Sequence, residues 1–76
     1  MVTVDLIALG AYIRERRKQL GMSQRALAKK MGIFQPDVSV IENGHVESGL
    51  LMVARLAVAL EMEPSELAAV AYGNTN

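Results

Sequence analysis

The stretch QRALAKKMGIFQPDVSVIEN, residues 24–43, predicts two short helices joined by a tight turn. Apolar side chains recur along it at spacings of three or four residues, which is the spacing of a buried helical face. They are Leu27, Ala28 and Met31 in the first helix and Val38 and Ile41 in the second. Gly32 lies between the two sets, and because it has no Cβ it can adopt the left-handed conformation that ends a helix.

A small residue followed four positions later by glycine, with apolar residues six and nine positions after that, is typical of a helix-turn-helix. Ala28, Gly32, Val38 and Ile41 fit this spacing. In DNA-binding proteins such a corner places its second helix in the major groove. Residues 24–43 are therefore the first candidate for a nucleic-acid interface.

Together with its flanks, this stretch resembles the Cro and lambda-repressor-like family of bacterial and phage regulators, also called the xenobiotic-response-element family. The segments that carry the resemblance are LGAYIRERRKQLGMSQ, SQRALAKKMGI, VSVIENG and LLMVARLAVALEMEPSEL. It extends over about Leu9 to Leu67, most of the chain. The resemblance implies an all-α fold, a compact five-helix DNA-binding domain whose second and third helices form the helix-turn-helix.

The apolar pattern agrees with five helices in a single domain over residues 1–76, with a core at about 5–71 and a frayed tail at 73–76. The expected helices span about 5–20, 24–31, 35–43, 49–61 and 64–71. Asp5 and Ser23 are the expected N-caps, and Pro64 suits a first helical turn. The inner faces of the first and fourth helices are predicted to carry Leu6, Leu9, Ile13 and Leu20, and Leu50, Val53, Leu56, Ala57 and Leu60.

Composition argues against several other functions. The chain has no cysteine and one histidine, so we expect neither a disulfide framework nor a metal site. Its serines, histidine and carboxylates show no arrangement that orients a nucleophile and a base, so we expect neither an enzyme nor a cofactor. The start of the chain lacks the basic residues of a secretory signal, and the apolar segment GLLMVARLAVAL is too short for a bilayer. We expect a cytoplasmic protein that makes no contact with membranes.

Positive charge is concentrated early in the sequence although the net charge is zero. Residues 1–32 contain seven basic and two acidic residues, a net charge of +5, whereas residues 33–76 contain one basic and six acidic residues, a net charge of −5. Lys and Arg contacts to phosphate dominate DNA affinity, so one basic face is expected to bind double-stranded DNA. The alternative is that these side chains only solvate two helix faces.

The exposed positions of the helix at 35–43 are the candidate base contacts: Gln35, Pro36, Asp37, Ser39 and Val40. Gln35 is the strongest, because its amide can pair with adenine through two hydrogen bonds and the family commonly uses this position for base contact. Ser39 can bond a base or a phosphate and Val40 can meet a thymine methyl, or either can be simply exposed. Asp37 is unfavourable beside phosphates unless it accepts from a cytosine amino group.

Phe34 stands where the family usually has a serine or threonine cap, and a phenyl ring offers no acceptor to the helix N–H groups. Pro36 partly compensates because it lacks one of those N–H groups, and Asp37 favours the helix dipole. We expect Phe34 to pack locally rather than to act as a wedge in DNA.

The candidate phosphate contacts are Gln24, Arg25, Lys29, Asn43 and His45. The resemblance implies that Gln24 uses its side chain and the free N–H groups of the first helical turn. After Gly44 the family often carries basic residues that contact phosphate, whereas this chain has His45, Val46 and Glu47, so we expect a lighter footprint on DNA. The alternative for His45 is a loop residue that makes no contact with DNA.

Glu42 lies near the carboxyl end of a helix, where the dipole disfavours a negative charge, so it should have a partner. The family pattern implies that this partner is Arg17 and that the pair locks the third helix onto the first. The alternative is two separate exposed charges.

The last two helices carry more apolar residues than a small core needs. We assign Leu51, Val58, Met62, Val70 and Tyr72 to a two-fold homodimer interface, with simple core packing as the alternative. A dimer would place two recognition helices about 34 Å apart on a palindrome. The sequence thus predicts a dimeric, DNA-binding repressor with no small-molecule ligand. The alternative is a protein-interaction module, antitoxin-like or an anti-regulator, that keeps the fold and binds DNA weakly or not at all.

Overall fold

The computed structural model describes residues 5–45 and 49–71. These residues form five helices and no strand: α1 (Leu6–Gln19), α2 (Gln24–Met31), α3 (Gln35–Glu42), α4 (Leu50–Ala59) and α5 (Pro64–Ala71). The predicted all-α class and the helix-turn-helix of α2 and α3 are confirmed, and every helix begins and ends within two residues of its predicted bounds. In the described ranges no helix has the length and apolar character that a membrane crossing requires.

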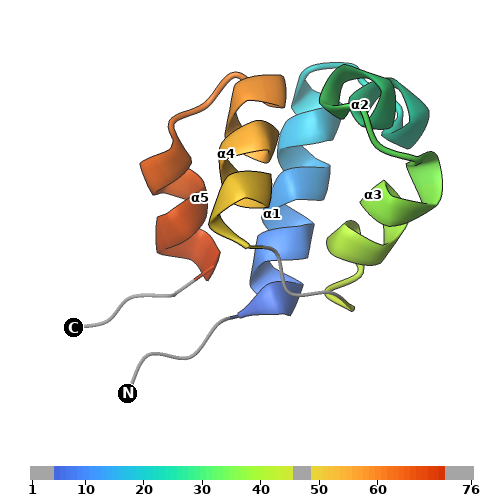
Figure 1. The fold of residues 1–76 in the computed structure, drawn as a ribbon. Coiled ribbons are helices and arrows are strands. Elements are labelled where there is room, and N and C mark those ends of the chain that lie inside the picture. Colours follow the sequence, from blue (N-terminus) through green and yellow to red (C-terminus); the bar gives the residue numbers. More distant parts are fainter. Residues whose placement is uncertain (1–4, 46–48, 72–76) are drawn as a thin grey trace.

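The helix α1 runs through the middle of the molecule, with α2 and α3 on one side and α4 and α5 on the other (Figure 1). It packs against α3 and α5, while α2 contacts both α3 and α4. This arrangement gives α3 two supports, α1 and α2, and leaves the opposite side of α3 open. The open side is where a ligand of α3 would lie.

Local capping explains where the first two helices begin and where the turn lies. The carboxylate of Asp5 accepts a hydrogen bond from the N–H of Ala8 at 2.9 Å, and the hydroxyl of Ser23 accepts one from the N–H of Ala26 at 3.0 Å. Gly32 ends α2 with a φ of 74°, the left-handed conformation that glycine tolerates best. The sequence predicted all three features, because each depends only on residues close together in the chain.

The hydrophobic core joins all five helices. Its buried members are Leu9, Ile13, Leu27, Ala28, Met31, Val38, Ile41, Val53, Leu56, Ala57, Ala59, Leu60, Leu67 and Ala71. Of the predicted inner-face residues, Leu6 and Leu20 are only half-buried because they lie at the two ends of α1. The side chain of Leu50 and the predicted frayed tail at 73–76 lie outside the described residues.

Gly10 lies where the backbones of α1 and α3 come close together, and sequence reasoning missed this contact. A Cβ at this position would lie 2.4 Å from the carbonyl oxygen of Glu42 and 2.6 Å from that of Ile41. Both distances are far below a normal contact, so only glycine lets the two helices pack at this separation. The signal in the sequence was a glycine inside an otherwise unbroken helical pattern.

We expect Gly10→Ala to lower the free energy of unfolding by about 1–3 kcal/mol, because the added methyl group must push α3 away from α1. Denaturant unfolding would measure the loss. Gly49→Ala is a suitable control, since a Cβ at Gly49 meets no atom of the described residues within 4 Å; its effect should stay below about 1 kcal/mol. Equal stability of Gly10→Ala and the unaltered protein would contradict this close packing.

Candidate nucleic-acid interface

A buried ion pair joins the carboxyl ends of α1 and α3. Arg17 Nε donates to Glu42 Oε2 at 2.6 Å and Arg17 Nη2 donates to Glu42 Oε1 at 3.0 Å, while Nη1 donates to the carbonyl of Met22 at 2.8 Å. The two side chains are 10% and 0% exposed. Such a two-pronged pair is the geometry in which arginine binds carboxylate most strongly. The structure therefore brings together the two residues that the family pattern implied.

The surroundings of Glu42 keep it ionised despite its burial. Burial alone would raise the pKa of this carboxyl, but the hydrogen bonds from Arg17 and Gln24 and the positive charge of Arg17 outweigh burial and hold the pKa below its usual value. The hydrogen bond to Glu42 likewise raises the pKa of Arg17, although burial opposes it. Both groups are thus charged at neutral pH, and the hydrogen bonds between them compensate for the burial of both charges.

The carboxylate of Glu42 also orients two residues of the predicted DNA-binding surface. Gln24 Nε2 donates to Glu42 Oε1 at 3.0 Å, and Gln24 Oε1 accepts from Gln35 Nε2 at 2.8 Å. Gln35 retains Oε1 and its second amide N–H for other partners, which is the pair of groups that a two-bond contact with adenine uses. Gln24 retains one amide N–H, which is sufficient for a phosphate oxygen.

A second set of contacts surrounds the carboxyl end of α3. Arg14 Nη2 donates to Asn43 Oδ1 at 2.9 Å, and Asn43 Nδ2 donates to Ser39 Oγ at 3.4 Å. Arg14 Nε also donates to Glu42 Oε1 at 3.4 Å. Sequence reasoning did not include Arg14 in the site, although its position one helical turn before Arg17 was a usable signal.

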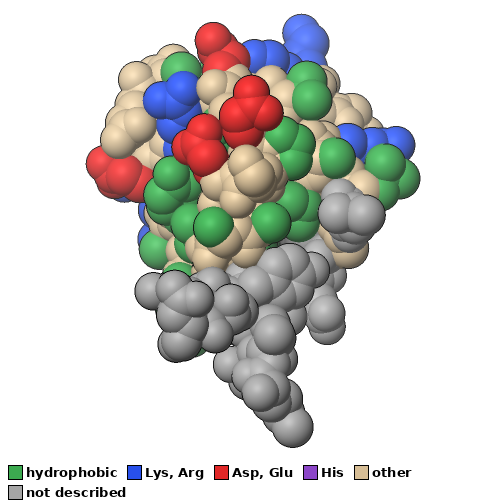
Figure 2. All heavy atoms as spheres, turned by 90° about the vertical axis from the view of Figure 1, so that its left-hand side faces the viewer, with side chains coloured by type: hydrophobic (Ala, Val, Ile, Leu, Met, Phe, Trp, Pro, Cys, Tyr) green, Lys and Arg blue, Asp and Glu red, His purple; other side chains and the backbone are tan. Residues whose placement is uncertain are grey.

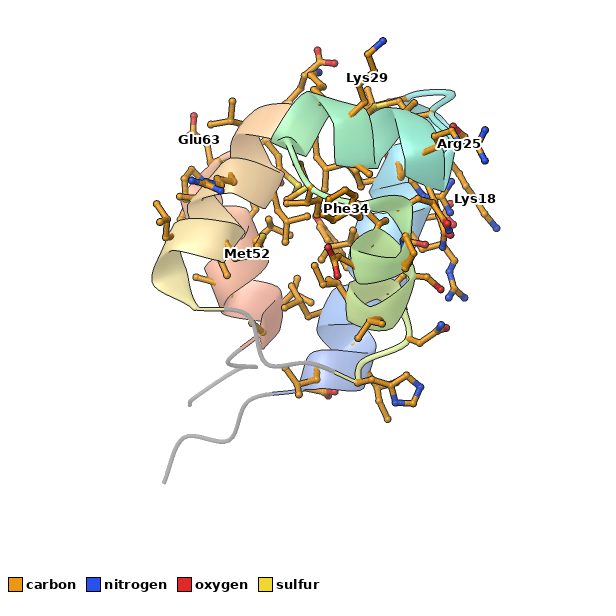
Figure 3. The ribbon with its side chains drawn as sticks, turned by 45° about the vertical axis from the view of Figure 1, so that its right-hand side comes forward. Lys18, Arg25, Lys29, Phe34, Met52 and Glu63 are labelled. Atoms are coloured by element: carbon orange, nitrogen blue, oxygen red, sulfur yellow. The ribbon has the colours of Figure 1, made fainter. Side chains whose placement is uncertain are left out.

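The basic side chains of the candidate phosphate contacts do not all point the same way. Lys18 and Arg25 extend from one edge of the molecule, whereas Lys29 projects from α2 in another direction (Figure 3). Lys18 was not among the predicted phosphate contacts, but it lies at the same edge of the molecule as Arg25. His45 is exposed just beyond α3.

The predicted base contacts of α3 differ in exposure. Pro36 and Asp37 are exposed, while Gln35, Ser39 and Val40 are half-buried. Gln35 and Ser39 each make one of the hydrogen bonds described above, so their side chains are held in place and remain partly exposed.

The prediction that Phe34 packs locally is wrong, because its side chain is 79% exposed. Phe34 is the N-cap of α3 and has an extended backbone, with φ −90° and ψ 148°. Its neighbour Ile33 is packed against the core, and successive side chains of an extended chain point in opposite directions, so Phe34 points outward. Asp37 Oδ2 accepts from the N–H of Phe34 at 3.4 Å, half of a capping box, whose other half a phenyl ring cannot supply.

The residues assigned to a dimer interface fall into three groups. Leu51 and Val58 are 68% and 76% exposed on α4. Met62 and Val70 are half-buried, and Met62 packs against the core. Tyr72 lies outside the described residues.

Comparison with known proteins agrees with this geometry. Residues 13–67 match the helix-turn-helix family, so the chain belongs to that family. Over 54 residues it is 37% identical to an uncharacterized HTH-type transcriptional regulator of Methanothermobacter thermautotrophicus, a match that covers 71% of this chain and 78% of the relative. The chain is a DNA-binding transcriptional regulator of the lambda-repressor-like type.

Two solved structures extend the comparison. The restriction-modification controller protein C.AhdI from Aeromonas hydrophila matches with a TM-score of 0.79 and 38% identity, over 83% of this chain and 91% of the controller. The P22 c2 repressor in complex with a synthetic operator matches with a TM-score of 0.72 and 34% identity, over 78% and 89% of the two chains. HppE, solved with FeII and a substrate, also matches, with a TM-score of 0.77 and 28% identity; the match covers 83% of this chain and 37% of the HppE chain.

We expect Arg17→Ala to lower the free energy of unfolding by about 3–5 kcal/mol, because it leaves the carboxylate of Glu42 buried without its main partner. Arg14→Ala is the matched control, since its side chain is 41% exposed and its contact with Glu42 is longer, 3.4 Å. The control should cost less than about 1 kcal/mol. Thermal melts of both variants would decide, and an unchanged melting temperature for Arg17→Ala would show that the pair does not stabilise the fold.

Proposed function

We propose that this regulator is a dimeric repressor that binds a palindromic operator through α3 in the major groove. The observation that carries the proposal is the continuous chain of hydrogen bonds from Arg17 through Glu42 and Gln24 to Gln35. It fixes the amide of Gln35 at the amino end of α3, and base contacts in helix-turn-helix proteins come from that end of the recognition helix. A base-contacting side chain that is already held in place loses little conformational freedom on binding DNA.

Phosphate contacts would then come from the elements that flank α3. Gln24 begins α2, where free N–H groups and the helix dipole favour a phosphate. Arg25 and Lys18 would add positive charge at one edge of the DNA-binding surface. Asn43 and His45, at the carboxyl end of α3, would contact the phosphate backbone of the DNA. We retain Lys29 as a weaker candidate because it points elsewhere.

The proposed dimer interface is centred on α4. Leu51 and Val58 are seven residues apart, two helical turns, so they lie on one side of that helix. Hydrophobic side chains lie exposed among acidic ones on the α4 and α5 side of the molecule (Figure 2). A two-fold axis through this side would cover both residues and would bring the two α3 helices onto successive turns of the DNA.

Charge complementarity supports the same two-fold arrangement. Val58 lines two adjoining grooves, one with Lys30 and Arg55 and the other with Glu61, Glu63 and Glu66. In a two-fold interface a groove of one copy can face the other groove of its partner, so unlike charges would meet on both sides of Val58.

Repression follows from occupancy of the operator and requires no catalysis, cofactor or small-molecule ligand in the proposed mode of action. The similarity to the P22 c2 repressor and to the controller C.AhdI supports a role at a promoter, in the cytoplasm, with occupancy set by protein concentration or by a protein partner. The competing proposal is a protein-interaction module. The exposed carboxylate of Asp37 in the first turn of α3 favours it, because an acid close to phosphates weakens DNA binding.

Selection from a randomised duplex library near physiological salt tests the proposal. We expect a palindrome with half-sites about one helical turn apart. Gln35→Ala should then relax the preference at one position of each half-site and cost about 1–3 kcal/mol of binding free energy. Gln19→Ala, which removes an exposed glutamine from α1, should leave base preference unchanged. Binding without any motif, lost at modest salt, would reject the repressor and favour the interaction module.

A separate measurement tests the dimer. The double variant Leu51→Glu and Val58→Glu should remain folded and sediment as a monomer, because the new carboxylates would lose their hydration in the interface and the one at position 58 would add to the negative charge of Glu61, Glu63 and Glu66. Ile7→Glu is the control, since Ile7 is 75% exposed on α1. Dimers that persist in the double variant would exclude this side of α4 as the interface.

A further inference from the structure

Phe34 has the highest exposure among the large hydrophobic side chains of the described residues. It is the N-cap of α3, which, like α4 and unlike α1 and α2, begins without a side chain that accepts a hydrogen bond from the first helical turn. The chain thus has an aromatic ring in solvent at the position where an acceptor would stabilise the helix.

The backbone around Phe34 is held on both sides. Before it, Ile33 packs against the core and donates its N–H to the carbonyl of Ala28 at 3.0 Å. After it, Gln35 is bonded to Gln24, and the N–H of Asp37 donates to the carbonyl of Phe34 at 2.9 Å. The ring therefore projects from a fixed point at the amino end of the recognition helix, directly beside Gln35.

We propose that Phe34 is a specificity-determining residue that contacts the C5-methyl group of a thymine next to the base pair read by Gln35. The thymine methyl is the apolar group that the base edges present in the major groove, and a phenyl ring is among the side chains that pack against it. The ring has no hydrogen-bonding group, so it distinguishes bases through this contact alone. The inference rests on the proposed operator binding by α3.

Insertion of the ring between base steps is a different mode. Apolar wedges of that kind act mainly from the minor groove and kink the duplex. The position of Phe34 beside Gln35, at the end of the helix that enters the major groove, favours the methyl contact.

The test uses the selected operator with single thymines replaced by deoxyuridine, which removes the methyl group and keeps the base pair. For the unaltered protein, we expect one such replacement in each half-site to weaken binding about three- to fivefold, the effect of one buried methyl group. Phe34→Ser should bind the thymine operator about tenfold more weakly and should not distinguish thymine from deoxyuridine at that position. Phe34→Leu, which keeps an apolar side chain, should retain the distinction.

Loss of folding does not confuse this test, since serine at the N-cap restores an acceptor and should make Phe34→Ser at least as stable as the unaltered protein. If no thymine replacement affects binding, or if Phe34→Ser keeps the full difference between thymine and deoxyuridine, the methyl contact is excluded. A kink in the bound duplex that disappears with Phe34→Ser would instead identify a wedge. Failure to select any operator would reject the proposed function itself, a result separate from these.

Discussion

The carboxylate of Glu42 is the point at which α1, α2 and α3 are tied together. It accepts hydrogen bonds from Arg14 and Arg17 of α1 and from Gln24 of α2, although it is buried. A buried carboxylate without such donors would be strongly destabilising, so the positions of all three helices depend on one another. The placement of Gln35 is a consequence, because Gln24 bonds both Glu42 and Gln35.

Most of the fold could be predicted from the sequence because its signals are local. Asp5, Ser23 and Gly32 mark helix starts and a turn through bonds and backbone conformations that involve residues at most four positions away. The apolar spacing of α2 to α5 likewise depends on one helix at a time. The ion pair of Arg17 and Glu42, 25 positions apart, came instead from the family resemblance.

The features that sequence reasoning missed depend on how helices meet and on which way a side chain points where a helix begins. A glycine within a helix does not reveal that Gly10 lies against the carbonyl groups of α3. Hydrophobic character predicted packing for Phe34, but the side chain follows the direction of an extended N-cap whose neighbour Ile33 takes the inner position. The bond between Gln24 and Gln35 requires the crossing of α2 and α3.

The start of α3 also determines how DNA would be held. Pro36 has no N–H, and the N–H of Asp37 already donates to the carbonyl of Phe34. The carboxylate of Asp37 accepts from the N–H of Phe34 and lies at the positive end of the helix dipole. The amino end of α3 therefore offers little to a phosphate. The amino end of α2, whose first turn contains no acid, remains available. On the proposed mode of binding, α2 positions the duplex and α3 is left to read bases, with an amide at Gln35 and an aromatic ring at Phe34.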